Sequence, residues 1–151
     1  GEMVAPDAFG RSIEYDDLAT GGSMMVFGPG RDVLKVASKF LKFFVEESCG
    51  YCTPCRAGNV LIKERLDRII DGKGDKDDIA YLEQLCNTVK VTSRCGLGQT
   101  SPNPVTSTLK NFRSEYESRL QDNPDRLELS FDINAELTEA AAITGRMSEH
   151  F

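Results

Sequence analysis

Three cysteines lie within seven residues of this 151-residue chain, in the run Cys49-Gly-Tyr-Cys52-Thr-Pro-Cys55, and a further cysteine stands at Cys95. Thiolates separated by two residues suit a cubane cluster, in which three irons take ligands from one loop and the fourth needs a distant thiolate. The stretch from Cys55 to Cys95 is long enough for two helices out and back, which would return Cys95 to the trio. The spacing predicts one [4Fe–4S] cluster bound by Cys49, Cys52, Cys55 and Cys95.

Three other interpretations of the clustered cysteines remain. Structural zinc usually takes two separated Cys-x-x-Cys pairs, which the three-plus-one spacing fits less well. A dithiol redox pair at Cys49 and Cys52 would need a thioredoxin-like βαβ pattern beside it, and the sequence shows none. A disulfide framework suits secreted proteins, whereas an odd count of five cysteines and no secretory signal favour a reducing compartment. We expect that compartment to be the cytoplasm.

Glycines and arginines beside the cysteines are expected to tune the cluster. Gly50, Gly96 and Gly98 would let backbone amides approach the sulfur atoms closely and donate hydrogen bonds to them. Such bonds raise the reduction potential of the cluster. The charges of Arg56 and Arg94 would favour the reduced, more negative cluster. For both arginines, a solvated surface charge is an equal alternative.

Other residues that could take part in redox chemistry or metal binding are not expected to be cluster ligands. Cys86 falls within a helical stripe with Leu82 and Val89, so we expect a small buried hydrophobe, with an alternative ligand as the second possibility. Tyr51 lies between two ligands, where it covers the cluster or lines an electron path, and we favour covering. The sequence gives no reason to make His150, next to the C-terminus, a ligand.

Apolar residues recur at three- and four-residue steps in four stretches, as in amphipathic helices. The first helix is expected over 32–47 with Asp32 as its N-cap, and the second over 58–71. Asp75 caps the third with a capping box, Gly96-Leu97-Gly98 forms a loop around Cys95, and the fourth helix opens at 101–104. The predicted inner faces are Val33, Val36, Ala37, Phe40, Leu41, Phe44 and Val45; Leu61, Ile62, Leu66, Ile69 and Ile70; Ile79, Leu82, Leu85, Cys86 and Val89; and Val105, Thr108, Leu109, Phe112, Tyr116 and Leu120.

These helices should bury their apolar faces together, so the predicted fold class is mainly α, a four-helix bundle over 31–120 that holds the cluster. Residues 1–30 form a loop-rich lead-in, in which the apolar run from Met24 to Phe27 predicts one short strand. A single strand cannot stand alone, so the lead-in should be the edge of something larger. Residues 121–151 form a C-terminal tail with a short helix, capped by Asn134 and ended by Gly145.

Charge and hydropathy limit the classes of partner. The net charge of −6 argues against nucleic acid, which needs a basic face on the protein. No apolar run approaches the roughly 20 residues that cross a bilayer, so we expect no direct membrane insertion. The chain begins with Gly1 rather than methionine, and we expect a processed product or a piece of a longer polypeptide.

Two motifs resemble a known family. Glu47-Ser-Cys-Gly-Tyr-Cys-Thr-Pro-Cys-Arg-Ala-Gly58 and Thr92-Ser-Arg-Cys-Gly-Leu-Gly-Gln-Thr-Ser-Pro-Asn-Pro104 are similar to the C-terminal part of the NADH-binding, flavin-bearing subunit of respiratory complex I. The same segment occurs in the large diaphorase subunit of soluble NAD-reducing nickel–iron hydrogenases and in NAD-dependent formate dehydrogenases. The similarity covers about residues 12–120, and the run 21–27 with Tyr51 looks most like the hydrogenase version.

The resemblance implies a function and a set of partners. Cys49, Cys52, Cys55 and Cys95 match the family's cluster ligands, and Cys86 matches none. The cluster would relay single electrons between FMN and iron–sulfur subunits of a multi-subunit complex, and residues 1–30 would end a ubiquitin-like β-grasp domain or be a linker.

The chain departs from the family in one respect. The glycine-rich loop with which the family binds FMN and NADH does not occur in this sequence, so the chain alone is not expected to oxidise NADH. The hypothesis from another class is a structural zinc-binding interaction module.

Overall fold

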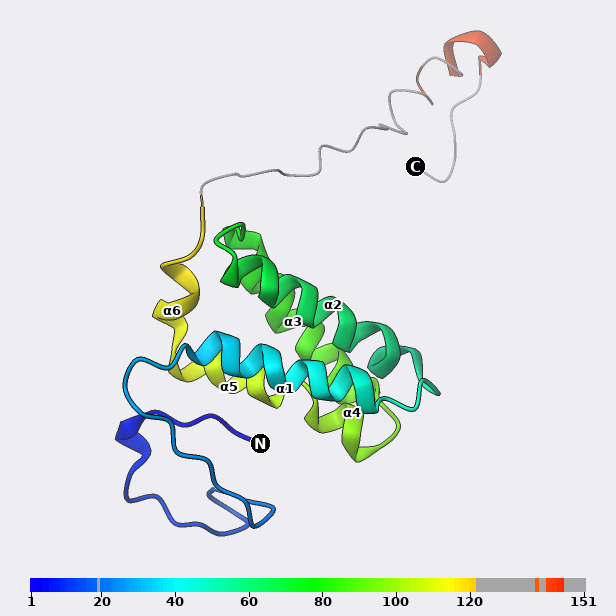
Figure 1. Ribbon diagram of the computed structural model, residues 1–151. Helices are drawn as coiled ribbons and strands as arrows, with labels where there is room; N and C mark the ends of the chain where they lie inside the picture. Colours follow the sequence, from blue (N-terminus) through cyan, green and yellow to red (C-terminus); the bar gives the residue numbers. More distant parts are fainter. Residues whose placement is uncertain (19, 122–137, 139–140, 146–151) are drawn as a thin grey trace.

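The computed structural model describes residues 1–18, 20–121, 138 and 141–145 of the chain. Four longer helices form a bundle: α1 (Val33–Glu47), α2 (Thr53–Ile70), α3 (Lys76–Thr92) and α5 (Asn103–Asn111). A 3-10 turn, η1 (Pro6–Ala8), and two short helices, α4 (Gly96–Thr100) and α6 (Arg113–Glu117), complete the described elements. In Figure 1, α2 and α3 lie side by side, and α1 lies in front of α5. The predicted mainly helical bundle is confirmed.

The predicted helix caps form at both aspartates. Asp32 accepts hydrogen bonds from the backbone N–H groups of Leu34 at 3.1 Å and Lys35 at 3.2 Å. Asp75 and Asp78 form the reciprocal capping box at the start of α3. Each cap satisfies backbone donors that the first helical turn leaves without a partner, and this fixes where each helix begins.

Three helix boundaries differ from the prediction. Helix α2 begins at Thr53 instead of 58, because Cys52 serves as N-cap and Pro54 is tolerated in the first turn. The expected loop at 96–98 is the short helix α4, with Cys95 as its N-cap. The expected fourth helix begins at Asn103 and breaks at Phe112, whose φ of −137° and ψ of 39° separate α5 from α6.

The core lies between α1, α2, α3 and α5, and most of the predicted inner faces are buried in it. Leu34 on α1 is completely buried although the predicted stripe omitted it, and Leu61 on α2 is exposed although the stripe included it. In both cases the predicted face is displaced by one residue, because positions three and four apart along a helix both lie close to the same face. The buried apolar residues are Leu34, Ala37, Leu41, Cys55, Ile62, Leu66, Ile69, Ile79, Leu82, Cys86, Val89, Val105, Leu109 and Tyr116.

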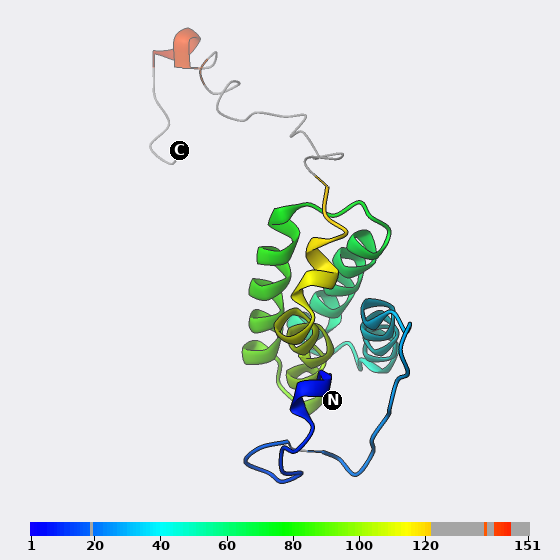
Figure 2. The same cartoon turned by 90° about the vertical axis from the view of Figure 1, so that its left-hand side faces the viewer.

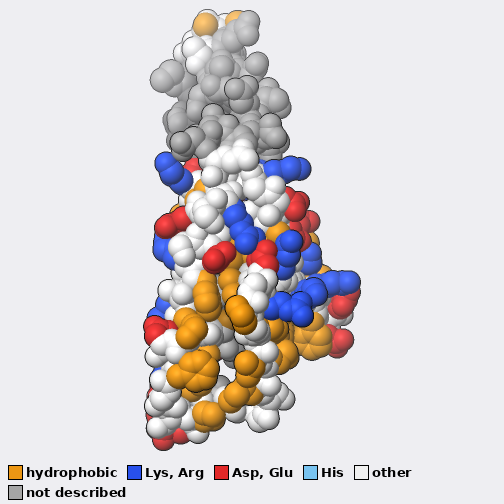
Figure 3. All heavy atoms as spheres, turned by 60° about the vertical axis from the view of Figure 1, so that its left-hand side comes forward, with side chains coloured by type: hydrophobic (Ala, Val, Ile, Leu, Met, Phe, Trp, Pro, Cys, Tyr) orange, Lys and Arg blue, Asp and Glu red, His pale blue; other side chains and the backbone are white. Residues whose placement is uncertain are grey.

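The lead-in runs as a long loop beside the bundle (Figure 2). It is fastened near its start, where Met3 N–H donates to Ser107 Oγ at 3.0 Å and Asn111 Nδ2 donates to the Met3 carbonyl at 2.7 Å. The run 24–27 forms no strand, because no partner strand lies beside it in the described part of the chain. The apolar side chains of this run are exposed. Figure 3 shows hydrophobic side chains gathered at the lower end of the molecule.

The end of the chain is described only in part. Residues 138 and 141–144 are helical, and Gly145, with φ of +64°, follows them as predicted. The predicted cap Asn134 lies outside the described residues. Within the described residues, no helix combines the length and apolar character that a bilayer crossing requires.

Candidate metal centre

The four predicted ligands lie at or near the starts of two helices. Cys49 stands in the turn after α1, Cys52 is the N-cap of α2, and Cys55 lies in the first turn of α2. Cys95 is the N-cap of α4, directly after the end of α3. Cys55 is buried and Cys52 half-buried, whereas Cys49 and Cys95 are exposed. The set therefore runs from the core of the bundle to its surface.

The segment that carries Cys95 lies against the segment that carries the trio. A Cβ on Gly98 would lie 2.6 Å from the Cβ of Ser93 and 3.1 Å from the Cβ of Cys55, and the first distance is too short for any residue other than glycine. The backbone N–H of Arg94, and then that of Cys55, lower the pKa of Cys52 by stabilising its thiolate. The Arg94 guanidinium also donates to the Tyr51 hydroxyl at 3.1 Å and lies 5.3 Å from the centroid of that ring. Two distant parts of the sequence thus meet around the cysteines.

The sulfur of Cys55 has two side-chain partners. Asn59 Nδ2 donates to Cys55 Sγ at 3.4 Å, and Ser48 Oγ lies 3.3 Å from the same sulfur. Ser48 Oγ accepts the Gly50 N–H at 3.3 Å, which leaves its own proton available for a thiolate. Hydrogen bonds of this kind orient a ligating thiolate and tune the metal that it binds.

Ser93 supplies the observation that tests whether a cluster fits here. Its Oγ is buried and has no hydrogen-bond partner, although the great majority of buried polar groups have one. A Cβ on Gly98 would lie 2.5 Å from this oxygen, so the hydroxyl and Cys55 contact the same glycine. A buried, unpartnered hydroxyl that shares a neighbouring glycine with a buried cysteine suits the sulfide and thiolate acceptors of an iron–sulfur cluster, and the residues present therefore fit that group.

Among the described residues, no three His, Cys, Asp or Glu side chains gather closely enough for a single metal ion. Thiolates around one zinc ion, with Zn–S bonds of about 2.3 Å, must lie within about 4 Å of one another. In a cubane each thiolate binds a different iron, so the thiolates stand farther apart. A cluster therefore does not require the close grouping of thiolates that a single metal ion needs.

The glycines and arginines predicted to tune the site behave differently from one another. Gly50 adopts φ of +75°, and its N–H reaches the Ser48 hydroxyl instead of a sulfur directly. A Cβ on Gly96 would meet nothing within 4 Å, whereas Gly98 is tightly packed. Arg56 is exposed and donates to the Gly50 carbonyl at 2.7 Å, so it braces the cysteine turn.

Two functional candidates escaped the sequence-based prediction. Asn59 follows Cys55 by four residues in one helix, so the spacing already placed the two on the same face. Ser101 donates to Asn59 Oδ1 at 2.7 Å and is 42 positions away. No local pattern in the sequence could have paired Ser101 with Asn59.

The fifth cysteine belongs to the core. Cys86 on α3 is completely buried, and burial raises the pKa of its thiol to about 12. A thiol that stays protonated at neutral pH is a poor ligand, because the thiolate is the metal-binding form. The predicted buried hydrophobe is confirmed, and His150 lies outside the described residues.

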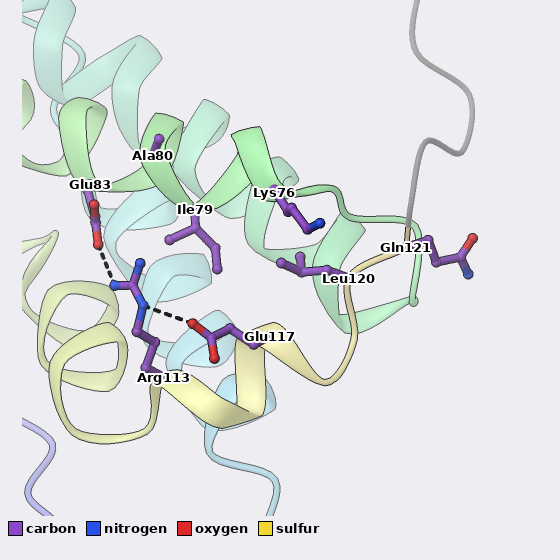
Figure 4. Close-up of a pocket in the computed structure, with 8 residues that line it drawn as sticks. All are labelled: Lys76, Ile79, Ala80, Glu83, Arg113, Glu117, Leu120 and Gln121. Carbon is purple, nitrogen blue, oxygen red and sulfur yellow. Dashed lines mark hydrogen bonds and ion pairs between the residues drawn. The ribbon is translucent and has the colours of Figure 1, made fainter.

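A separate groove of about 520 Å³ lies between α3 and α6, away from the cysteines (Figure 4). Arg113 crosses it and pairs with Glu83 at 2.8 Å and with Glu117 at 3.1 Å. The pair with Glu83 joins α6 to α3, whereas the pair with Glu117 lies within α6, and exposed pairs of this kind contribute at most about 1 kcal/mol.

Comparisons with known proteins show the family of this chain. The family model described as the NADH-ubiquinone oxidoreductase-F iron-sulfur binding region matches residues 35–119. The alpha subunit of the NAD-reducing hydrogenase HoxS from Cupriavidus necator is 40% identical over 138 residues, which are 91% of this chain and 23% of that protein. One component of the NADH-quinone oxidoreductase of Streptomyces coelicolor is 32% identical over 114 residues, 72% of this chain and 25% of that protein.

A solved structure has a similar fold. The crystal structure of an NAD+-reducing [NiFe]-hydrogenase in the H2-reduced state matches with a TM-score of 0.74 at 34% identity, covering 97% of this chain and 25% of that one. The chain thus spans about a quarter of the length of the relatives that it matches. The protein belongs to the family of NADH-ubiquinone oxidoreductase-F iron-sulfur binding regions, whose cofactor is a [4Fe–4S] cluster.

Proposed function

We propose that this chain is the electron-transfer segment of an NAD(H)-linked diaphorase, and that Cys49, Cys52, Cys55 and Cys95 bind its [4Fe–4S] cluster. When bound, the cluster would accept and give up electrons one at a time. The observation that carries the proposal is the packing of Gly98 against Cys55, which brings the segment of Cys95 to the trio.

The chain's own residues would hold the cluster, exclude water and set its charge balance. Cys55, on the buried side, would fix the cluster to the bundle, with Asn59 and Ser48 donating to its sulfur. Cys49 and Cys95 would lie on the exposed side, where electrons enter or leave. Arg94 directly precedes Cys95, and its charge would favour the reduced cluster.

The finer assignments rest on the relatives. An NAD-reducing hydrogenase is the setting we favour, because the HoxS alpha subunit matches 91% of the chain. The same segment of complex I or of an NAD-dependent formate dehydrogenase is the alternative. FMN and NAD would bind to a preceding domain, iron–sulfur subunits of the complex would be the partners, and the complex would work in the cytoplasm. Residues 1–30, with their exposed apolar side chains, would end a β-grasp domain of the longer assembly.

The test is the composition of the chain after anaerobic purification. We expect about four irons and four acid-labile sulfides for each chain, with a low-temperature EPR signal on reduction. Zinc without sulfide would support the structural zinc module instead. A second assay, NADH oxidation with ferricyanide, should give no turnover with this chain alone, and turnover would show that the chain binds flavin and nucleotide itself.

A further inference from the structure

The environment of Cys55 contains a buried amide that the ligand set does not use. Asn59 and Ser101 are both completely buried, and they lie on segments that follow different cysteines. The chain of hydrogen bonds runs from the Ser101 hydroxyl to Asn59 Oδ1 at 2.7 Å, and from Asn59 Nδ2 to Cys55 Sγ at 3.4 Å. Buried polar networks of this kind hold their members in one arrangement, because each lost bond leaves an unsatisfied group.

We propose that Asn59 is a positioning residue that raises the reduction potential of the cluster through Cys55, and that Ser101 fixes the amide in the required orientation. The inference rests on the proposed function, because it concerns a cluster bound through Cys55. It adds a role for two residues that are not ligands.

The orientation of the amide follows from the chemistry of its neighbours. A ligating thiolate carries no proton and only accepts hydrogen bonds, so the N–H side of Asn59 must face it. Asn59 Oδ1 then points away and needs a donor, which the Ser101 hydroxyl provides. Ser101 Oγ also lies 3.0 Å from the Gly98 carbonyl, a second acceptor for the same hydroxyl. The contact with the Gly98 carbonyl therefore holds the Ser101 hydroxyl within hydrogen-bond distance of Asn59 Oδ1.

The sign of the effect on the potential follows from charge. Reduction adds one negative charge to the cluster and its thiolates. An N–H dipole directed at a sulfur stabilises that added charge, so it favours the reduced form. Because Asn59 is shielded from water, its dipole acts in a medium of low dielectric, where it counts for more than at the surface.

The experiment is an EPR-monitored redox titration of the complete chain under anaerobic conditions. We expect Asn59→Leu, which keeps the volume and removes the donor, to lower the potential by about a tenfold change in the reduction equilibrium, or about 59 mV for one electron. Ser101→Ala should shift the potential in the same direction by about threefold, because the amide keeps its place but loses its anchor.

Matched controls are available on α5, away from the cysteines. Asn111→Leu and Ser107→Ala remove an amide and a hydroxyl that bond to the backbone of Met3, and both should keep the potential of the unaltered chain. A potential in Asn59→Leu equal to that of Asn111→Leu would overturn the inference. If Asn59→Leu retains no cluster, Ser101→Ala decides, and equality with Ser107→Ala overturns it. An unaltered chain without iron and sulfide would instead reject the proposed function.

Discussion

The two ends of the bundle differ in the partners of their buried polar groups. At the end where α2 turns into α3, the buried carboxylate of Asp78 pairs with Arg65 and with Arg68, and also closes the capping box with Asp75. At the cysteine end, Ser93 Oγ is buried without a partner, and the side-chain donor of Asn59 is directed at a sulfur. At the first end each of these polar groups has a partner within the chain, whereas at the second the Asn59 donor is directed at Cys55 Sγ and the buried Ser93 hydroxyl has no partner.

The polar groups at one end of the bundle therefore serve stability, and those at the other end serve the cluster. A closed network of ion pairs and caps fixes a turn and contributes to folding. Donors around sulfur are what a cluster needs for its position and potential. Substitutions at the two ends should therefore change different measurements.

The largest expected effect is at the cysteine end. Cys95→Ala should abolish the cubane or leave a three-iron remnant, because one iron loses its thiolate. Cys86→Ala is the matched control and should keep the iron content and the EPR signal, since that thiol lies in the core. An unchanged EPR signal in Cys95→Ala would remove Cys95 from the ligand set, and loss of the cluster in Cys86→Ala would contradict its assignment to the core.

The next effect belongs to the opposite end. Asp78→Ala removes the buried carboxylate that pairs with Arg65 and Arg68 and takes away one half of the capping box, so it should lower the free energy of unfolding by about 3 kcal/mol. Urea denaturation measures this loss. Glu64→Ala, at an exposed position of α2, should change stability by less than about 0.5 kcal/mol. A cluster potential altered by Asp78→Ala would show that the two ends are coupled.

A smaller effect is expected at the contact between Gly58 on α2 and Val89 on α3. A Cβ on Gly58 would overlap Val89 Cγ2, and Val89 is buried and stiff, so Gly58→Ala should destabilise the chain by about 2 kcal/mol. Gly96→Ala, whose Cβ meets nothing within 4 Å, is the control in thermal denaturation. The double variant Gly58→Ala with Val89→Ala should lose less stability than the sum of the two single variants, because the shorter side chain at position 89 removes the overlap. Strict additivity would show that the overlap is not the cause.

The smallest effect depends on pH and concerns Cys86. Burial raises its pKa to about 12, whereas an unfolded cysteine titrates near about 8.5. The unfolded chain therefore loses this proton first, and stability should fall above about pH 8.5 by up to about 1.4 kcal/mol for each pH unit.

The control for this pH effect is Cys86→Ala, which should lack that component in urea denaturation between about pH 8.5 and about pH 10. Burial also raises the pKa of Tyr116, and its contribution begins only at the upper end of this range, because an unfolded tyrosine titrates near about 10. Parallel pH profiles for the two chains would contradict the buried, protonated thiol.

Much of the bundle could be predicted because its signals are local. The caps at Asp32 and Asp75 and the apolar stripe of α3 follow from residues a few positions apart, which the helical repeat places on one face. The start of α2 was placed too late because the cysteine turn and the first helical turn share the same residues. The break at Phe112 was missed because an apolar stripe continues across it.

The sequence by itself determined the helical stripes, the caps and the identity of the thiols, because each depends on spacing along one segment. Only the tertiary structure decided which groups surround those thiols. The pairing of Ser101 with Asn59, the contact of Gly98 with Cys55 and the unpartnered hydroxyl of Ser93 all depend on how α3 and α4 return to α2. Contacts between distant segments are set by the packing of whole helices, and no local pattern encodes them.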